Sequence, residues 1–250
     1  MKQTRILMGM PVTLEVIDPQ VTLVDLDAVY DYFTYVDEKF STYKEASEIS
    51  QINRGELTPD RISGDMRTIF TLAEQTSQDT NGYFDILYNG LYDPSGIVKG
   101  WAIYHAAELL HRKDFKNFYI DAGSDVEAAG KIDRGEAWRV GIRNPFNTAE
   151  IVKIVGISNC GLATSGTYIR GQHIYNPYRP GPITDIMSLT VIGPNVYEAD
   201  RYATAAFAMG CDGIAFIENL TGFEGYMIDQ NRRATFTSGF GKVSVSGRMR

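Results

Sequence analysis

The segment SLTVIGPNVYEADRYATAAFAMG, residues 188–210, joins the two patterns from which the fold class can be inferred. Its first part, residues 188–193, is a short β-type run that ends at Gly193 and is followed by Pro194 and Asn195. The part at 198–209 is rich in alanine, which favours a helix, and Gly210 marks its end. The stretch therefore predicts a strand followed by a helix.

Helical patterns are concentrated in the first half of the chain. Apolar side chains recur on one helical face at Leu23, Leu26, Tyr30, Phe33, Val36 and Phe40. Ser63 is predicted to be the N-cap of a second helix, with Asp65 in its first turn. A turn at 93–96 is followed by a third predicted helix at 97–112.

Strand patterns dominate the second half. Residues 5–17 predict one strand near the start, and short β-type runs follow at 118–120, 126–129, 138–142 and 151–157. Separated helices and strands favour an α+β fold over a regular βαβ alternation. No internal repeat or linker is visible, so we expect residues 1–250 to form a single domain.

The composition excludes several classes of protein. A net charge of −7 argues against a nucleic-acid-binding surface, which needs clustered Lys and Arg. Cys160 and Cys211 lie far apart and lack the spacing of a zinc site or a disulfide framework. We recognise no signal peptide and no apolar run long enough to span a bilayer, so we expect no membrane insertion and a cytoplasmic location.

Asp200 and Thr204 are the strongest candidates for a metal site. They stand four residues apart in the predicted helix, which places both side chains on one face. A carboxylate and a hydroxyl offer hard oxygen ligands, which suit Mg²⁺ better than a softer metal. The spacing fits at least as well a purely structural pair, in which the dipole of a helix N-terminus favours the Asp and the Thr is packed in the interior. Spacing alone leaves both interpretations open.

Two further segments carry candidate residues. The helix predicted after Asp93 begins with free N–H groups that attract anions, and Lys99 in its first turn is better explained with an anion nearby. His173 lies in a loop rich in Gly and Pro, where a neutral imidazole can accept a proton. A solvated surface lysine and a surface histidine are the alternatives. No nucleophile elbow, P-loop or dinucleotide-binding fingerprint is present.

Segments typical of one known family occur in order along nearly the whole chain. They are MGMP at 8–11, FSTYKEASEISQINR at 40–54, TNGYFDI at 80–86, DPSGIVKGWAI at 93–103, YIDAGSDVEAAGK at 119–131, WRVGIRNP at 138–145, ATSGTYIR at 163–170, HIYNPYRPGP at 173–182 and the stretch at 188–210. In this order they resemble the ApbE family of FAD:protein FMN transferases. One motif is weak support, whereas the ordered series is specific.

The resemblance implies a fold and a set of site residues. The fold has mixed sheets with helices, in two lobes that enclose an FAD cleft. Mg²⁺ is expected at Asp200, Thr204 and the backbone carbonyl of Gly96, and His173 is expected to be the general base. The residues expected to line the FAD site are Met8, Tyr43, Tyr83, Phe84, Asp85, Asp93, Lys99 and Tyr175.

The resemblance also implies an activity. It is the Mg²⁺-dependent transfer of FMN from FAD to a Thr or Ser hydroxyl of an acceptor flavoprotein, with release of AMP. Two alternatives use the same site: an FAD pyrophosphatase with water as acceptor, and a non-catalytic FAD-binding protein. The chain departs from the family at Asn176, which replaces an aspartate, and at Ala203, where some relatives carry an acidic residue.

Overall fold

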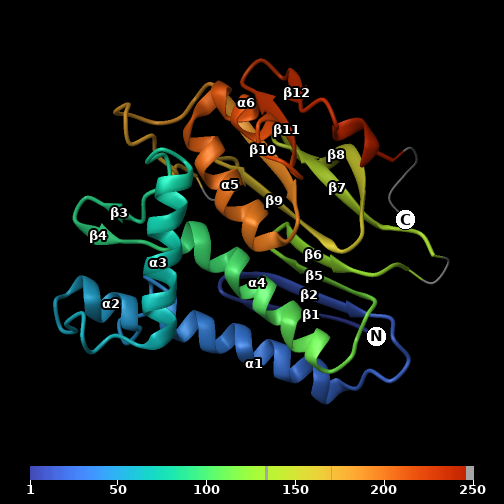
Figure 1. Cartoon of the computed structure of the whole chain (residues 1–250), viewed down its shortest axis with the longest axis horizontal. Coiled ribbons are helices and arrows are strands. Elements are labelled where there is room, and N and C mark those ends of the chain that lie inside the picture. The colour runs from blue at the N-terminus through green and yellow to red at the C-terminus, as the bar shows by residue number, and fades with distance from the viewer. Residues whose placement is uncertain (133–134, 170, 246–250) are drawn as a thin grey trace.

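The computed structural model describes residues 1–132, 135–169 and 171–245, and a long antiparallel sheet runs through it (Figure 1). Across this sheet the strands are β1 (Lys2–Leu7), β2 (Met10–Val16), β5 (Phe118–Ala122), β6 (Asp125–Ala129), β9 (Cys160–Gly166), β10 (Ile186–Gly193), β11 (Glu224–Asp229) and β12 (Ala234–Phe236). Two separate hairpins are β3 (Leu87–Tyr88) with β4 (Leu91–Tyr92), and β7 (Trp138–Asn144) with β8 (Asn147–Ile157). The helices are α1 (Leu23–Phe40), α2 (Glu48–Asn53), α3 (Gly64–Asp79), α4 (Ser95–Arg112), α5 (Val196–Ala208) and α6 (Gly213–Glu218), with 3₁₀ turns at Gly210–Asp212 and Phe240–Lys242.

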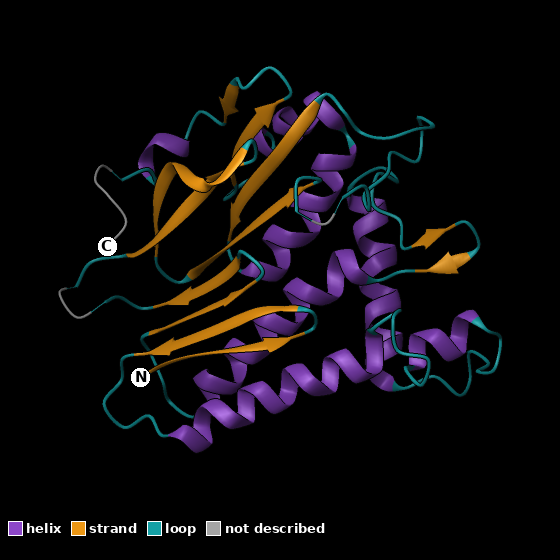
Figure 2. Cartoon of the chain, turned by 180° about the vertical axis from the view of Figure 1, so that it is seen from behind, coloured by secondary structure: helices purple, strands orange, loops and turns teal. Residues whose placement is uncertain are grey.

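The two faces of the sheet are covered differently. Helices α4 and α5 cross one face, where Leu189 and Val191 of β10 pack with Phe207 of α5 (Figure 1). Figure 2 shows the strands from the opposite side, where the β7–β8 hairpin packs over the sheet. There Trp138 and Val155 belong to one buried cluster with residues of β6, β9, β10 and β11. Side chains that alternate between the faces thus fill two layers of core.

The helical predictions are confirmed. The apolar face predicted in α1 is buried from Leu26 to Phe40, whereas its first member, Leu23, is 58% exposed because it lies at the very start of the helix. The Ser63 side chain accepts a hydrogen bond from the Met66 N–H at 3.2 Å at the start of α3. Helix α4 begins at Ser95, two residues before the prediction, and α5 ends just before Gly210 as expected. The α+β prediction is confirmed as well, because the described strands pair antiparallel, whereas a βαβ alternation gives parallel pairs.

The single strand predicted at 5–17 is wrong. The segment is a hairpin in which Leu7 pairs with Met10, and the turn between them is formed by Met8 and Gly9. Both turn residues have positive φ, 51° and 72°, as a two-residue turn that matches the twist of the strands requires. Alternation continues through so short a turn, so the sequence pattern does not reveal it. Helices α2 and α6 and strand β9 were not predicted either.

Within the described residues, no helix is both long and apolar enough to cross a membrane. The cytoplasmic location stays a prediction from the sequence. One member of the ATSGTYIR motif, Arg170, lies outside the described part of the chain.

Candidate active site

A cavity of about 1100 Å³ lies where the start of α4, the middle of α5 and the turn of the β1–β2 hairpin meet. Its wall continues along the end of α1, the β3–β4 hairpin, β9 and the loop after β9. All the residues predicted for the site line this cavity: Met8, Tyr43, Tyr83, Phe84, Asp85, Asp93, Gly96, Lys99, His173, Tyr175, Asp200 and Thr204. The fold thus brings the separated candidate residues into one place.

The ligands predicted on α4 and α5 face each other. The Thr204 hydroxyl donates a hydrogen bond to the Gly96 carbonyl at 3.4 Å. A Cβ added at Gly96 would lie 3.1 Å from Thr204 Cγ2, and one added at Gly100 would lie 2.6 Å from Asp200 Cβ. The two glycines therefore permit the close crossing that places the three predicted ligands together.

Asp200 is an almost completely buried carboxylate, with 3% of the residue exposed. Its Oδ2 accepts a hydrogen bond from the Gly100 N–H at 2.8 Å, and its Oδ1 lies 3.8 Å from Lys99 Nζ. Burial is the main cause that raises the pKa of Asp200 to about 7, opposed by Lys99 and supported by the nearby Asp125. A cation bound at this carboxylate would favour its ionised form.

The chemistry of the donor set fits Mg²⁺. A carboxylate, a hydroxyl and a backbone carbonyl are all hard oxygen ligands. No group of three or more His, Cys, Asp or Glu residues suited to a metal gathers within residues 1–132, 135–169 and 171–245. Mg²⁺ usually takes few protein ligands and completes its shell with phosphate oxygens and water.

Lys99 forms an ion pair with Asp125, a residue that was not predicted for the site. Its Nζ lies 2.6 Å from Oδ2 of Asp125, whose Oδ1 accepts a hydrogen bond from the Thr164 N–H at 3.0 Å. Asp125 is fully buried beside the cavity. The available signal was its position directly after Gly123 and Ser124, in the motif at 119–131.

The segment after α3 shapes one wall of the cavity. The Thr80 hydroxyl accepts a hydrogen bond from the Phe84 N–H at 3.2 Å, and Phe84 is buried. Oδ1 of Asp85 accepts from the Leu87 N–H at 2.8 Å, and Oδ1 of Asp93 accepts from the Ser95 N–H at 3.0 Å. These two carboxylates thus also fix the backbone, and Asp93 sets the point at which α4 begins.

Met8 and Tyr43 occupy other parts of the wall. Met8 adopts the left-handed backbone conformation in the β1–β2 turn, which directs this turn into the cavity lining. Tyr43 follows α1 and is 84% exposed, so it lies at the rim. An aromatic ring at a cavity rim offers a flat apolar surface to a ligand.

The loop after β9 is attached to the opposite wall. The Tyr175 hydroxyl donates to the carbonyls of Asp85 at 3.0 Å and Leu87 at 3.2 Å, and its ring lies 4.1 Å from that of Tyr88. His173 is exposed, and its Nδ1 lies 2.8 Å from the Gly171 carbonyl. Because a carbonyl only accepts, Nδ1 carries the proton of the neutral ring and Nε2 carries the lone pair that a base needs.

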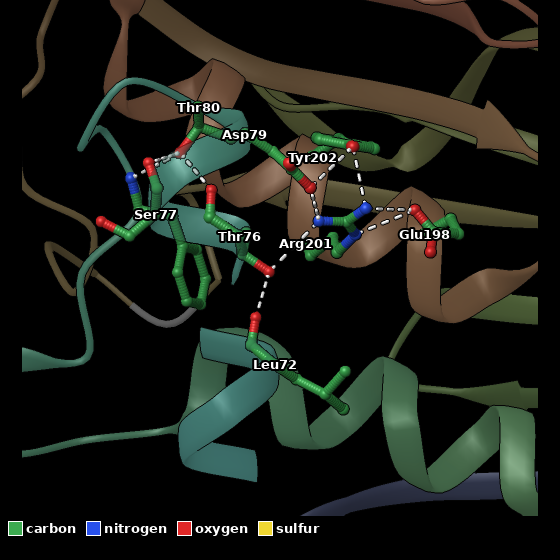
Figure 3. A network of polar contacts seen from close by, with 9 residues as sticks. Leu72, Thr76, Ser77, Asp79, Thr80, Glu198, Arg201 and Tyr202 are labelled. Carbon is green, nitrogen blue, oxygen red and sulfur yellow. Dashed lines mark hydrogen bonds and ion pairs between the residues drawn. The ribbon is translucent and has the colours of Figure 1, made fainter. Parts of the chain in front are cut away.

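Arg201, a buried residue that was not among the predicted site residues, directly follows Asp200 on α5 (Figure 3). Arg201 donates to Asp79 Oδ2 at 2.8 Å and to the Thr76 hydroxyl at 3.3 Å, both on α3. It also bonds Glu198 at 2.8 Å and the Tyr202 hydroxyl at 2.8 Å. This network fixes α5 against the end of α3, from which the cavity wall continues.

Comparison with known proteins identifies the family to which the chain belongs. A sequence profile described as the ApbE family matches residues 8–93 and 91–227. The chain belongs to the ApbE family. Among solved structures, the ApbE flavin transferase of Vibrio cholerae has a TM-score of 0.84 over 97% of this chain and 98% of its own, at 21% identity. That similarity supports the ApbE fold.

Curated members of the ApbE family are similar in sequence. The FAD:protein FMN transferase of Haemophilus influenzae is 25% identical in an alignment that covers 71% of this chain and 70% of that protein. The FAD:protein FMN transferase of Klebsiella pneumoniae is 30% identical in an alignment that covers 54% of this chain. The matched part is 42% of the Klebsiella protein, less than half of its length.

Proposed function

We propose that this protein is a Mg²⁺-dependent FAD:protein FMN transferase. It transfers the FMN moiety of FAD to a Thr or Ser hydroxyl of an acceptor flavoprotein and releases AMP. The observation that carries the proposal is the meeting of all the predicted residues in one cavity, with the oxygen ligands where α4 crosses α5. Its volume of about 1100 Å³ suits a ligand as large as a dinucleotide. We further propose that residues 1–250 act as one domain.

The proposed site neutralises charge on the pyrophosphate of FAD. Asp200, Thr204 and the Gly96 carbonyl would hold Mg²⁺, which as a Lewis acid stabilises negative charge on phosphate oxygens. Lys99 lines the cavity next to Asp200 and supplies a second positive charge. An acidic protein can hold an anionic ligand in this way because the cations are local.

In the proposed reaction the acceptor hydroxyl attacks FAD, and His173 accepts its proton. The oxygen of the acceptor hydroxyl forms a bond to the phosphorus on the FMN side of the pyrophosphate, and the bond from that phosphorus to the bridging oxygen breaks. His173 Nε2 takes the hydroxyl proton, and AMP leaves with the bridging oxygen. The exposure of His173 allows a protein substrate to reach it.

The test uses purified protein with FAD and Mg²⁺, and proteins extracted from cells that lack the gene as acceptors. We expect flavin that stays bound to an extract protein after denaturation, detected by fluorescence and by the added mass of FMN, and AMP in equal amount. Chelation of Mg²⁺ should stop the reaction. Conversion of FAD to free FMN and AMP, with no protein-bound flavin, would refute transfer and identify a pyrophosphatase instead.

A further inference from the structure

Asp125 is a fully buried carboxylate beside the cavity that the proposed reaction does not use. It begins β6, directly after a turn in which Gly123 and Ser124 have positive φ. Its Oδ1 accepts the Thr164 N–H at 3.0 Å, and its Oδ2 lies 2.6 Å from Lys99 Nζ. The bond from the backbone of β9 fixes the carboxylate, and the carboxylate in turn fixes the ammonium group.

Lys99 stands between two carboxylates at unequal distances. Its Nζ lies 2.6 Å from Asp125 but 3.8 Å from Oδ1 of Asp200. The attraction between two charges weakens with distance and is strong where water is excluded, as it is at these two buried carboxylates. Asp125 is therefore the stronger partner. With both carboxylates ionised, the three side chains carry one excess negative charge, which favours a further cation.

We infer that Asp125 is a positioning residue that holds Lys99 away from Asp200 and thereby keeps the Asp200 carboxylate open to a divalent cation. The identity of that cation as Mg²⁺ rests on the proposed function. Among the described residues, Asp200 is the other carboxylate within 4 Å of the Lys99 ammonium group. Without the charge on Asp125, Lys99 would pair with Asp200 and compete with the metal.

The test measures metal binding directly, by titration of the purified protein with Mn²⁺ and detection of free Mn²⁺ by electron paramagnetic resonance. Asp125→Asn keeps an oxygen for the Thr164 N–H but removes the charge. We expect it to raise the Kd for Mn²⁺ about 10- to 100-fold, the usual effect of losing a group that orients a metal ligand. Asp125→Asn combined with Lys99→Met should restore Kd to nearly the wild-type value, because the competing cation is gone.

A matched control is Asp121→Asn, which removes a partly buried carboxylate that accepts the Ser124 N–H at 3.0 Å. It should change the Kd for Mn²⁺ far less than Asp125→Asn does. Circular dichroism and thermal unfolding establish that each variant is folded. Rescue by the second substitution supports the inference, since removal of a lysine would not repair a purely structural defect.

Two results would overturn this inference and leave the proposed function intact: unchanged Mn²⁺ binding by Asp125→Asn, or weak binding that persists in the double variant. If Asp125→Asn does not fold, the Kd of Lys99→Met for Mn²⁺ is the test. It should bind Mn²⁺ at least as tightly as the wild type, and weaker binding overturns the inference. A wild-type protein that binds no Mn²⁺ would overturn the metal site of the proposed function and this inference with it.

Discussion

Gly100 and Asp200 lie on different helices, and the Gly100 N–H donates a hydrogen bond to Asp200 Oδ2 at 2.8 Å. The contact joins α4 directly to the carboxylate that we propose as a metal ligand. This hydrogen bond requires glycine at position 100. A Cβ added there would lie 2.6 Å from Asp200 Cβ and 3.0 Å from the Val196 carbonyl oxygen, too close for both helices to keep their positions. The packing of two helices and the geometry of the site thus depend on the same residue.

Gly100→Ala should destabilise the protein. The added methyl group forces α4 and α5 apart, and overpacking of this kind costs about 1–3 kcal/mol. Gly64→Ala is the control, because nothing lies within 4 Å of a Cβ at Gly64. That variant should keep or slightly raise the free energy of unfolding. Urea denaturation measures both, and equal stabilities would contradict the close crossing of the helices.

Thr204→Val should impair Mg²⁺-dependent transfer more than Thr204→Ser. Valine keeps the shape of threonine but removes the hydroxyl that lies 3.4 Å from the Gly96 carbonyl, whereas serine keeps the hydroxyl. We expect the valine variant to need at least about tenfold more Mg²⁺ for half-maximal rate. Initial rates over a Mg²⁺ series give this value. A serine variant as poor as the valine variant would show that the methyl group matters, not the oxygen.

Local sequence patterns predicted the long helices and several strands, but not every element and not all of the contacts. The helices at Leu23–Phe40 and Gly64–Asp79 carry periodic apolar faces and end at recognisable residues, so they could be predicted. The turn at Met8 and Gly9 could not be predicted, because the alternation of apolar and polar residues continues through it from one strand to the next. The spacing of Asp200 and Thr204 fitted a helix cap and a packed threonine at least as well as a metal site, and only the ordered series of family motifs made the pair an expected metal site.

Contacts between residues that lie far apart in the sequence could not be predicted, for a different reason. Asp125 and Lys99 are separated by most of α4 and all of β5, and no local rule connects a lysine with a strand residue beyond them. The family resemblance placed the site residues in one cleft, and the cavity contains them all. Their individual roles stay predictions until variants are measured.

His173→Ala should retain FAD binding and lose most of the transfer activity. His173 lies in the exposed loop after β9, whereas the predicted metal ligands lie on α4 and α5. Loss of a general base typically reduces the rate by about 10²- to 10⁴-fold. Single-turnover transfer at saturating FAD measures the chemical step, and a fluorescence titration measures FAD affinity. Unchanged single-turnover transfer would rule out His173 as the base.

Arg201→Met should lower the free energy of unfolding by about 1–3 kcal/mol, since hydrogen bonds to charged groups are lost and their partners are left partly buried. The guanidinium bonds Asp79 and Thr76 on α3 as well as Glu198 on α5 (Figure 3). Arg67→Met, on the exposed face of α3, is the matched control and should change stability little. Similar losses in the two variants would mean that the network does not hold α3 against α5.

Glu127→Gln should change how stability depends on pH. Glu127 Oε2 accepts the N–H of Val196, the first residue of α5, at 2.6 Å, and burial raises the pKa of this carboxyl from 4.5 to about 7. Because its folded-state pKa lies above the unfolded value, the Glu127 carboxyl contributes stability below about pH 4.5, and this contribution is lost as the pH rises through 7.

The glutamine of the variant does not titrate. Relative to the wild type, the variant should therefore gain about 1–3 kcal/mol of unfolding free energy between pH 5 and pH 8. Urea denaturation at both pH values measures the difference, and parallel pH profiles would show that the Glu127 carboxyl titrates at its ordinary pKa.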